Sequence, residues 1–118
     1  MQGDDNLSKL NAALADFVEE RDWEQFHNPK NLAMALAAEA GELLEHFQWL
    51  SAAEADSLGS TQRHEVAMEM ADILMFLLRL ADRLQVDLVK AAEEKLESNR
   101  LRYPVEKARG RATKYDKL

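Results

Sequence analysis

Two apolar segments of this chain each carry a pair of acidic residues three positions apart. The first segment contains Glu39 and Glu42, and the second contains Glu69 and Asp72. Both segments lack proline and are rich in Leu, Ala and Met, which favours helices. On a helix, this spacing places both acids of a pair on one face. The pattern therefore predicts two helices, each with two carboxylates on a largely apolar surface.

The acids have no basic residue close by in sequence. Lys and Arg are absent from residues 31–62 and 64–78. A carboxylate beside apolar surface is costly unless it is neutralised or meets a cation, and Mg²⁺ is the simplest such cation. A solvated helix face is the alternative, because a chain with 22 acidic residues is expected to contain some pairs at this spacing by chance.

The ligand types separate magnesium from iron. Di-iron helical bundles use Glu-x-x-His motifs on their helices. Here the only such spacing is Glu24 to His27, which leads into a turn rather than lying in the middle of a helix. Oxygen ligands without histidine suit Mg²⁺ or Mn²⁺ better.

The remaining helices follow from periodicity and capping residues. Apolar residues recur with helical spacing over residues 6–21, which predicts the first helix. Asn28 is an expected N-cap with Pro29 at the first helical position, and this second helix is expected to run to about Leu50.

A capping box and two further helices are expected after Leu50. Ser51 and Glu54 have the capping-box spacing, and Ser60 or Thr61 can cap a third helix that ends near Leu84. A fourth helix is expected from an Asp87 cap to about Tyr103, followed by an extended basic tail over residues 105–118. These elements predict an all-α, four-helix bundle-like fold.

The third helix also predicts assembly. Its residues 73–80 are apolar nearly all round, apart from Arg79. A monomer of this size cannot easily cover such a helix, so burial in a helical oligomer is expected.

Composition limits the class of protein. At 118 residues the chain is expected to be one domain spanning 1–118. The net charge of −7 argues against binding of nucleic-acid polymers. The chain has no cysteine, no apolar run long enough for a membrane span and no secretory or transit sequence at its start, so a cytoplasmic protein is expected.

The acids by themselves indicate phosphate chemistry. Mg²⁺ held by a few carboxylates usually completes its coordination with water and substrate phosphates. The sequence has no P-loop, no nucleophile elbow and no kinase-type glycine-rich loop. A water molecule activated by the metal is therefore the expected nucleophile.

The acid pairs together with several other segments resemble the MazG-like, all-α nucleoside triphosphate pyrophosphohydrolases. The similarity is greatest to the dCTP pyrophosphatase branch and covers the chain from about Leu7 to its end. The segments that carry this resemblance, besides the acid pairs, are residues 20–32, 41–49, 98–105 and 114–115.

The resemblance implies an activity and a set of site residues. Members cleave a nucleoside triphosphate between the α and β phosphates, and the preferred substrate of this branch is dCTP or a modified dCTP. By resemblance, Glu39, Glu42, Glu69 and Asp72 hold Mg²⁺, with Glu45 assisting. The nucleobase is bound by Trp23, Gln25, Phe26, His27, Trp49 and Phe76, and the phosphates by Lys95, Asn99 and Tyr103, with Arg102 and Arg109 as weaker candidates.

Two positions depart from this branch. Where the branch has a histidine on the first helix and a tyrosine on the third, this chain has Leu14 and Phe76. Loss of two polar groups can alter the base preference. The same reaction on another base such as dUTP, or on many bases, is therefore the alternative within the family.

The resemblance also implies a homotetramer built as a dimer of dimers. A non-catalytic helical scaffold is the competing class of protein. In such a scaffold the acids would be surface charge and the aromatic turn near Trp23 would bind a partner. That hypothesis leaves the absence of cations near the acids unexplained.

Overall fold

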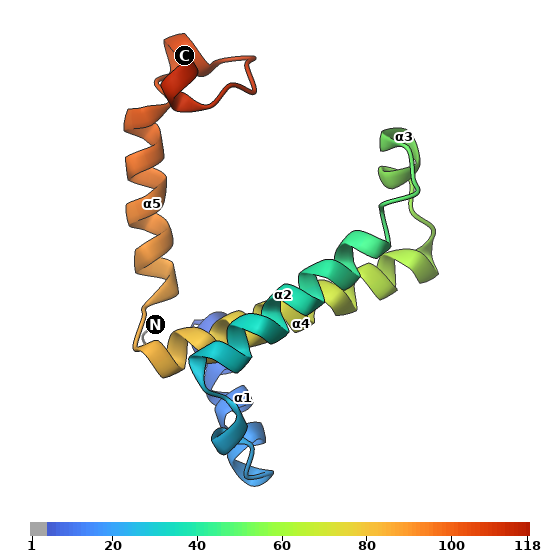
Figure 1. The fold of residues 1–118 in the computed structure, drawn as a ribbon, viewed down its shortest axis with the longest axis vertical. Helices are drawn as coiled ribbons and strands as arrows, with labels where there is room; N and C mark the ends of the chain where they lie inside the picture. Colours follow the sequence, from blue (N-terminus) through green and yellow to red (C-terminus); the bar gives the residue numbers. More distant parts are fainter. Residues whose placement is uncertain (1–4) are drawn as a thin grey trace. The chain divides into compact units, whose positions relative to one another are not determined.

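A computed structural model describes residues 5–118 of the chain (Figure 1). Helices and turns account for all regular structure in this range, and no strand occurs in it. The predicted all-α fold class is confirmed. The elements are α1 (Asn6–Glu20), η1 (Glu24–Phe26), α2 (Pro29–Glu45), α3 (Ala52–Ala55), α4 (Ser60–Leu84), α5 (Leu88–Arg102), α6 (Val105–Ala108) and η2 (Tyr115–Lys117).

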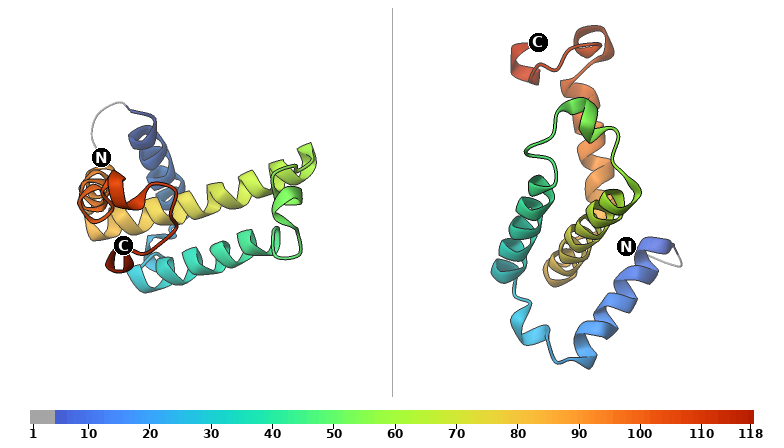
Figure 2. Two further views of the ribbon diagram at one scale, coloured as in Figure 1. Left: turned by 90° about the horizontal axis from the view of Figure 1, so that it is seen from above. Right: turned by 90° about the vertical axis from the view of Figure 1, so that its right-hand side faces the viewer.

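The chain forms two compact units. The longer unit ends at Val86 and contains α1 to α4. Within it, α2 and α4 lie side by side and run in opposite directions, joined by a loop that contains α3 (Figures 1 and 2). Helix α1 packs on α4. The shorter unit comprises Asp87–Leu118.

Side-chain caps begin α2 and α3 at the predicted residues. The Asn31 backbone N–H donates to Asn28 Oδ1 at 2.9 Å, and Pro29 occupies the first turn of α2. Ser51 and Glu54 form a reciprocal capping box at α3. These interactions satisfy backbone donors that a helix start leaves unpaired.

Helix α2 is shorter than its sequence predicts. It ends at Glu45 rather than near Leu50, and residues 46–49 form a turn. The His46 N–H bonds to the Leu43 carbonyl three residues back, which tightens the last turn. The tightening redirects the chain before α3.

The start of α4 also differs from the prediction. Gly59 is the N-cap and makes no side-chain hydrogen bond, while Ser60 is already helical. The expected Ser60 or Thr61 cap is therefore wrong. The end of α4 at Leu84 is as predicted, and the left-handed residue Gln85 is its C-cap.

Few side chains of the longer unit are fully buried. Val18 of α1, Leu32 of α2 and Leu78 of α4 have at most 1% of their surface exposed. By contrast, Met34 on α2 and Met70 on α4 are more than half exposed. Helices α2 and α4 therefore carry apolar surface that residues 5–86 do not cover.

The shorter unit folds its C-terminal segment back on itself. The Tyr115 ring packs edge-on against the Tyr103 ring, with 6.1 Å between centroids, and the Arg102 guanidinium lies 4.7 Å from the Tyr115 ring centroid. Both geometries are favourable aromatic contacts. The expected extended tail over 105–118 is instead a folded segment with two short helical turns.

The sequence predicts no membrane-spanning segment. Among residues 5–118, no helix combines the length and the apolar character needed to cross a bilayer.

Candidate active site

Three of the predicted acids meet between α2 and α4. Glu39 projects from α2, and Glu69 and Asp72 project from α4. One carboxylate oxygen from each lies within 4.8 Å of the other two. The meeting follows from the sequence, because spacing of three keeps Glu69 and Asp72 on one face of α4 and the antiparallel pairing places α2 opposite. We call Glu39, Glu69 and Asp72 the acidic cluster.

The acidic cluster concentrates negative charge at a partly buried place. The pKa of Glu39 is raised to about 7. The largest cause is the adjacent Glu69 carboxyl group, with which a protonated Glu39 can form a hydrogen bond, followed by loss of hydration and by the nearby carboxyl groups of Glu42 and Asp72. Oε2 of Glu39 and Oε2 of Glu69 are buried, and neither has a hydrogen-bond partner among the described residues. The arrangement therefore requires a proton or a cation.

The donor set fits a hard divalent cation. All three cluster residues offer carboxylate oxygens, and such ions prefer oxygen ligands. Two of these oxygens are buried without a donor. None of the ion pairs formed within residues 5–118 involves a cluster residue. A metal ion would supply the missing positive charge.

The other two predicted acids lie at the edge of the cluster or beyond it. Glu42 is exposed, but its carboxyl group is close enough to Glu39 to raise the pKa of Glu39. Glu45, one turn further along α2, is also exposed, and no interaction joins it to the cluster. The metal-binding role of Glu42 and the assisting role of Glu45 stay predictions.

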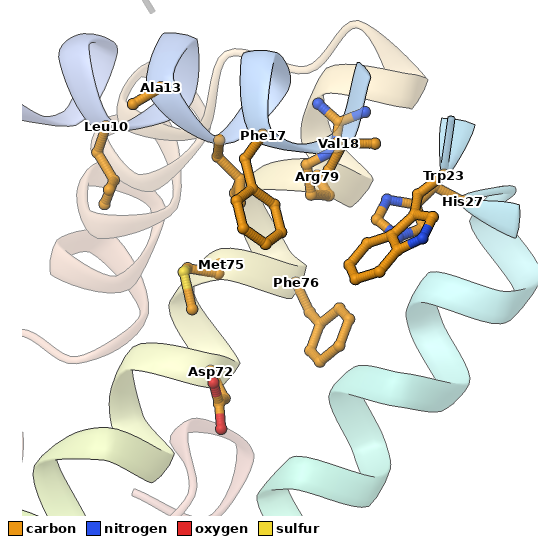
Figure 3. Close-up of a pocket in the computed structure, with 11 residues that line it drawn as sticks. Leu10, Ala13, Phe17, Val18, Trp23, His27, Asp72, Met75, Phe76 and Arg79 are labelled. Carbon is orange, nitrogen blue, oxygen red and sulfur yellow. The ribbon is translucent and has the colours of Figure 1, made fainter. Parts of the chain in front are cut away.

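An apolar pocket of about 490 Å³ adjoins the acidic cluster (Figure 3). Asp72 belongs to both, since it lies at one edge of the pocket and Phe17, Trp23 and Phe76 surround the space beyond it. The full lining is Leu10, Ala13, Leu14, Phe17, Val18, Trp23, His27, Asp72, Met75, Phe76 and Arg79. Trp23, His27 and Phe76, predicted to bind the nucleobase, are thus together in one cavity.

Three other residues predicted to bind the base do not line this pocket. The Gln25 amide donates to the carbonyl of Asp22 at 3.0 Å and to its carboxylate at 3.1 Å. Phe26 is 58% exposed, and Trp49, in the turn after α2, is 86% exposed. Within residues 5–118 of a single chain these side chains point elsewhere, and their binding roles stay predictions.

The predicted phosphate-binding residues belong to the shorter unit. Lys95 and Asn99 lie four positions apart on α5, and Tyr103 is its C-terminal cap. They therefore share one face of that helix. Arg102 stacks on Tyr115, and Arg109 follows α6. Their roles in binding phosphate stay predictions.

Sequence reasoning missed several residues that line the pocket. Phe17 and Val18 lie among the apolar residues that predict the first helix, and nothing in that pattern marks them as residues that line a pocket. Arg79 was overlooked because it interrupts an apolar run. A signal was available, since Arg79 follows Asp72 by seven residues and thus lies about two turns along the same face of α4.

His27 completes the wall as a neutral group. Burial lowers the pKa of His27, and the positive charge of Arg79 lowers it further, against an opposing effect of Glu24. Its Nδ1 atom is buried without a hydrogen-bond partner among the described residues. The imidazole therefore contributes a polar edge to the pocket without adding positive charge.

Antiparallel helices that bring carboxylates together beside an aromatic pocket define an all-α protein with a carboxylate cluster suited to a divalent cation. Residues 34–118 match the MazG-like family, and the chain belongs to that family.

Named relatives agree with this assignment. The chain is 46% identical over 114 residues to dCTP pyrophosphatase 1 of Rattus norvegicus and 44% identical over 114 residues to that of Homo sapiens. Each alignment covers 95% of this chain and 67% of the relative. A crystal structure of a pyrophosphatase from Archaeoglobus fulgidus is similar with a TM-score of 0.81 and 35% identity, covering 88% of this chain and 97% of the other. The resemblance to the dCTP pyrophosphatase branch is confirmed.

Proposed function

We propose that this chain is a nucleoside triphosphate pyrophosphohydrolase that converts dCTP, or a base-modified dCTP, to the monophosphate and pyrophosphate. The observation that carries the proposal is the position of Asp72, which belongs both to the acidic cluster and to the aromatic pocket. The relatives named dCTP pyrophosphatase 1 supply the substrate class.

The acidic cluster would hold Mg²⁺, with Mn²⁺ as a possible substitute. Glu39, Glu69 and Asp72 are the proposed ligands, and Glu42 is the proposed fourth. When bound, the ion neutralises charge on the phosphates and lowers the pKa of a bound water molecule. The buried, unpaired oxygens of Glu39 and Glu69 support this assignment.

The protein's own residues then position the reactants. A cluster carboxylate accepts the proton of the attacking water as the water oxygen bonds to the α-phosphorus. The bond from that phosphorus to the oxygen that bridges it to the β-phosphorus breaks, and pyrophosphate leaves. Chemistry of this kind depends mostly on positioning and charge neutralisation. Lys95, Asn99 and Tyr103 are the proposed phosphate contacts.

The pocket would hold the nucleobase. Trp23 and Phe76 supply aromatic faces, which can stack on any base. Leu14 and Phe76 line this pocket and are apolar, so they offer no hydrogen bond to discriminate between bases. Hydrolysis of dUTP or of several triphosphates is the alternative preference. Trp49 would complete the base site within a homotetramer of two dimers, because it is exposed in a single chain.

Pyrophosphate release from a panel of natural and base-modified deoxynucleoside triphosphates tests the proposal. With Mg²⁺ present, we expect dCTP or a modified dCTP to give the highest kcat/KM. Asp72→Asn should lower kcat by a factor of at least about 100, because it removes charge at the reacting centre. Glu65→Gln, which changes an exposed acid on the same helix, is the matched control and should retain activity. No turnover of any triphosphate would refute the proposal.

A further inference from the structure

Arg79 is a buried cation whose side chain is tied to two carboxylates. Only 1% of its surface is exposed. Its Nη2 donates to Glu24 Oε1 at 2.9 Å, and its Nη1 donates to Asp82 Oδ2 at 3.2 Å. A buried guanidinium is costly unless it is paired and hydrogen-bonded, so these two contacts hold the side chain in one orientation.

The two carboxylates have different structural consequences. Asp82 lies on α4 itself, three residues after Arg79, so that pair links α4 only to itself. Glu24 lies in η1, 55 positions away in sequence. Among the hydrogen bonds and ion pairs of the described residues, those of Glu24 alone connect the segment 21–28 to α4. The second of these interactions, the ion pair between Arg83 Nη1 and Glu24 Oε2, is long at 3.8 Å, and both side chains are exposed to solvent.

Glu24 belongs to the same short segment as two pocket residues. Trp23 precedes it directly and His27 follows three positions later, and both line the pocket. Trp23 is otherwise attached to α1, through an N–H bond to the Val18 carbonyl and an edge-on contact of its ring with Phe17. Because Trp23 remains 43% exposed, burial alone does not fix its distance from α4.

Arg79 occupies the end of the pocket opposite the acidic cluster. In Figure 3 Asp72 lies at one end and Arg79 at the other, with Phe76 and Trp23 between them. Arg79 Nε is buried and has no hydrogen-bond partner among the described residues. Both Nη atoms of Arg79 are held by carboxylates, and through Glu24 Arg79 acts on the wall of the pocket that carries Trp23 and His27.

On the basis of the proposed function, we propose that Arg79 is a positioning residue for the nucleobase. By holding Glu24, it fixes the distance between the Trp23–His27 wall and Phe76 on α4, and thereby sets the width of the slot that receives the base. The three acids of the cluster lie on α2 and α4, and among the described residues none of them forms a hydrogen bond or ion pair with η1. Loss of the Arg79–Glu24 pair therefore weakens substrate binding and leaves the chemical step largely intact.

Steady-state kinetics on matched variants test this role. Arg79→Met keeps an apolar stem of similar length and removes the link, so we expect KM for dCTP to rise about tenfold while kcat changes less than about threefold. Arg79→Lys retains the charge but cannot bridge both carboxylates, and should give an intermediate KM. Asp82→Asn is the control, because it weakens the other contact of Arg79 without touching η1, and its KM should equal that of the wild type.

The Arg79–Glu24 ion pair can also be removed by replacing Glu24, its more exposed partner. Glu24→Ala changes a side chain that is 45% exposed and leaves Asp82 as the remaining partner of the buried guanidinium. It should raise KM as Arg79→Met does, and the double variant should be no worse than either single one, because both remove the same contact. An unchanged KM in Arg79→Met, or an equal rise in Asp82→Asn, would overturn the proposal.

Hydrogen exchange measured by mass spectrometry provides a readout that does not depend on activity. The backbone amides of residues 21–28 should exchange faster in Arg79→Met and Glu24→Ala than in Asp82→Asn or the wild type. Unchanged exchange would refute the positioning role even if the enzyme is active. If exchange responds but no triphosphate is hydrolysed by the wild type, the proposed function fails while the structural link stands.

Discussion

Glu39 carries the most perturbed carboxyl group described in this chain. Its pKa is raised to about 7, first by hydrogen bonding with Glu69 and then by lost hydration and neighbouring charge. The folded state therefore binds a proton at Glu39 more tightly than the unfolded state does. This contribution to stability is complete below the ordinary glutamate pKa and is lost as the pH rises through about 7.

A pH dependence of stability follows for the metal-free protein. In the presence of a chelator, the free energy of unfolding should fall between about pH 5 and pH 8 more steeply for the wild type than for Glu39→Gln, which has no proton to lose. Urea denaturation at several pH values measures the difference. Glu65→Gln should keep the wild-type slope. Equal slopes for the wild type and Glu39→Gln would show that Glu39 is ionised throughout.

At the residue scale, the helical spacing of the acids in the sequence predicted that they share a helix face. It did not predict all the residues that line the pocket. Three acids meet because a helix repeats every 3.6 residues, which sequence reveals directly. The link from Arg79 to Glu24 spans 55 positions and depends on how α1, η1 and α4 pack. No local pattern encodes that contact. The resemblance to known proteins did not predict the Arg79–Glu24 contact either, because the binding residues that it implies include neither Arg79 nor Glu24.

At the element scale, Gly41 lies inside α2 without a packing reason in this structure. A Cβ atom built there meets nothing within 4 Å. Among the described residues, no backbone or side chain of another element makes a close approach to this position.

Gly41→Ala should therefore stabilise the protein. Alanine is favoured over glycine inside a helix by about 1 kcal/mol, partly through the unfolded state. Thermal or urea unfolding measures the gain, with Ala40→Gly on the same exposed stretch of α2 expected to give a loss of similar size. Destabilisation by Gly41→Ala would instead show that another subunit or a ligand packs against this position.

Helix ends were predicted best where a side chain provides the cap. Asn28 and Ser51 behave as expected because their oxygens accept specific backbone N–H groups. The end of α2 has no such signal in sequence, and the apolar pattern continues past Glu45 into the turn that carries Trp49. The prediction from periodicity alone therefore placed the end of α2 several residues too late.

At the scale of the whole molecule, apolar surface remains to be covered. Within residues 5–86, Met68, Met70 and Leu74 on α4 are exposed, as is Met34 on α2. Soluble monomers rarely expose large contiguous apolar patches. We therefore expect the protein to be an oligomer in solution, as the apolar third helix predicted from sequence.

A lysine at Met70 tests this expectation. Met70 is 57% exposed in one chain, so Met70→Lys should not disturb the fold of the monomer. If α4 packs against another subunit, the buried charge should shift the protein to a smaller species in light scattering after size-exclusion chromatography. Thr61→Lys adds the same charge at an exposed polar position of α4 and should not. A wild-type monomer would contradict the expectation.

Asp72 belongs both to the acidic cluster and to the pocket lining, and this restricts which positions can change when the substrate preference evolves. On α4, each position that lines the pocket is within about two turns of Asp72, which we propose acts in hydrolysis, so substitutions there risk displacing that acid. The walls contributed by α1 and η1 carry no acid of the cluster. New substrate preferences should therefore evolve more readily on those walls, at positions such as Leu14, while α4 changes slowly.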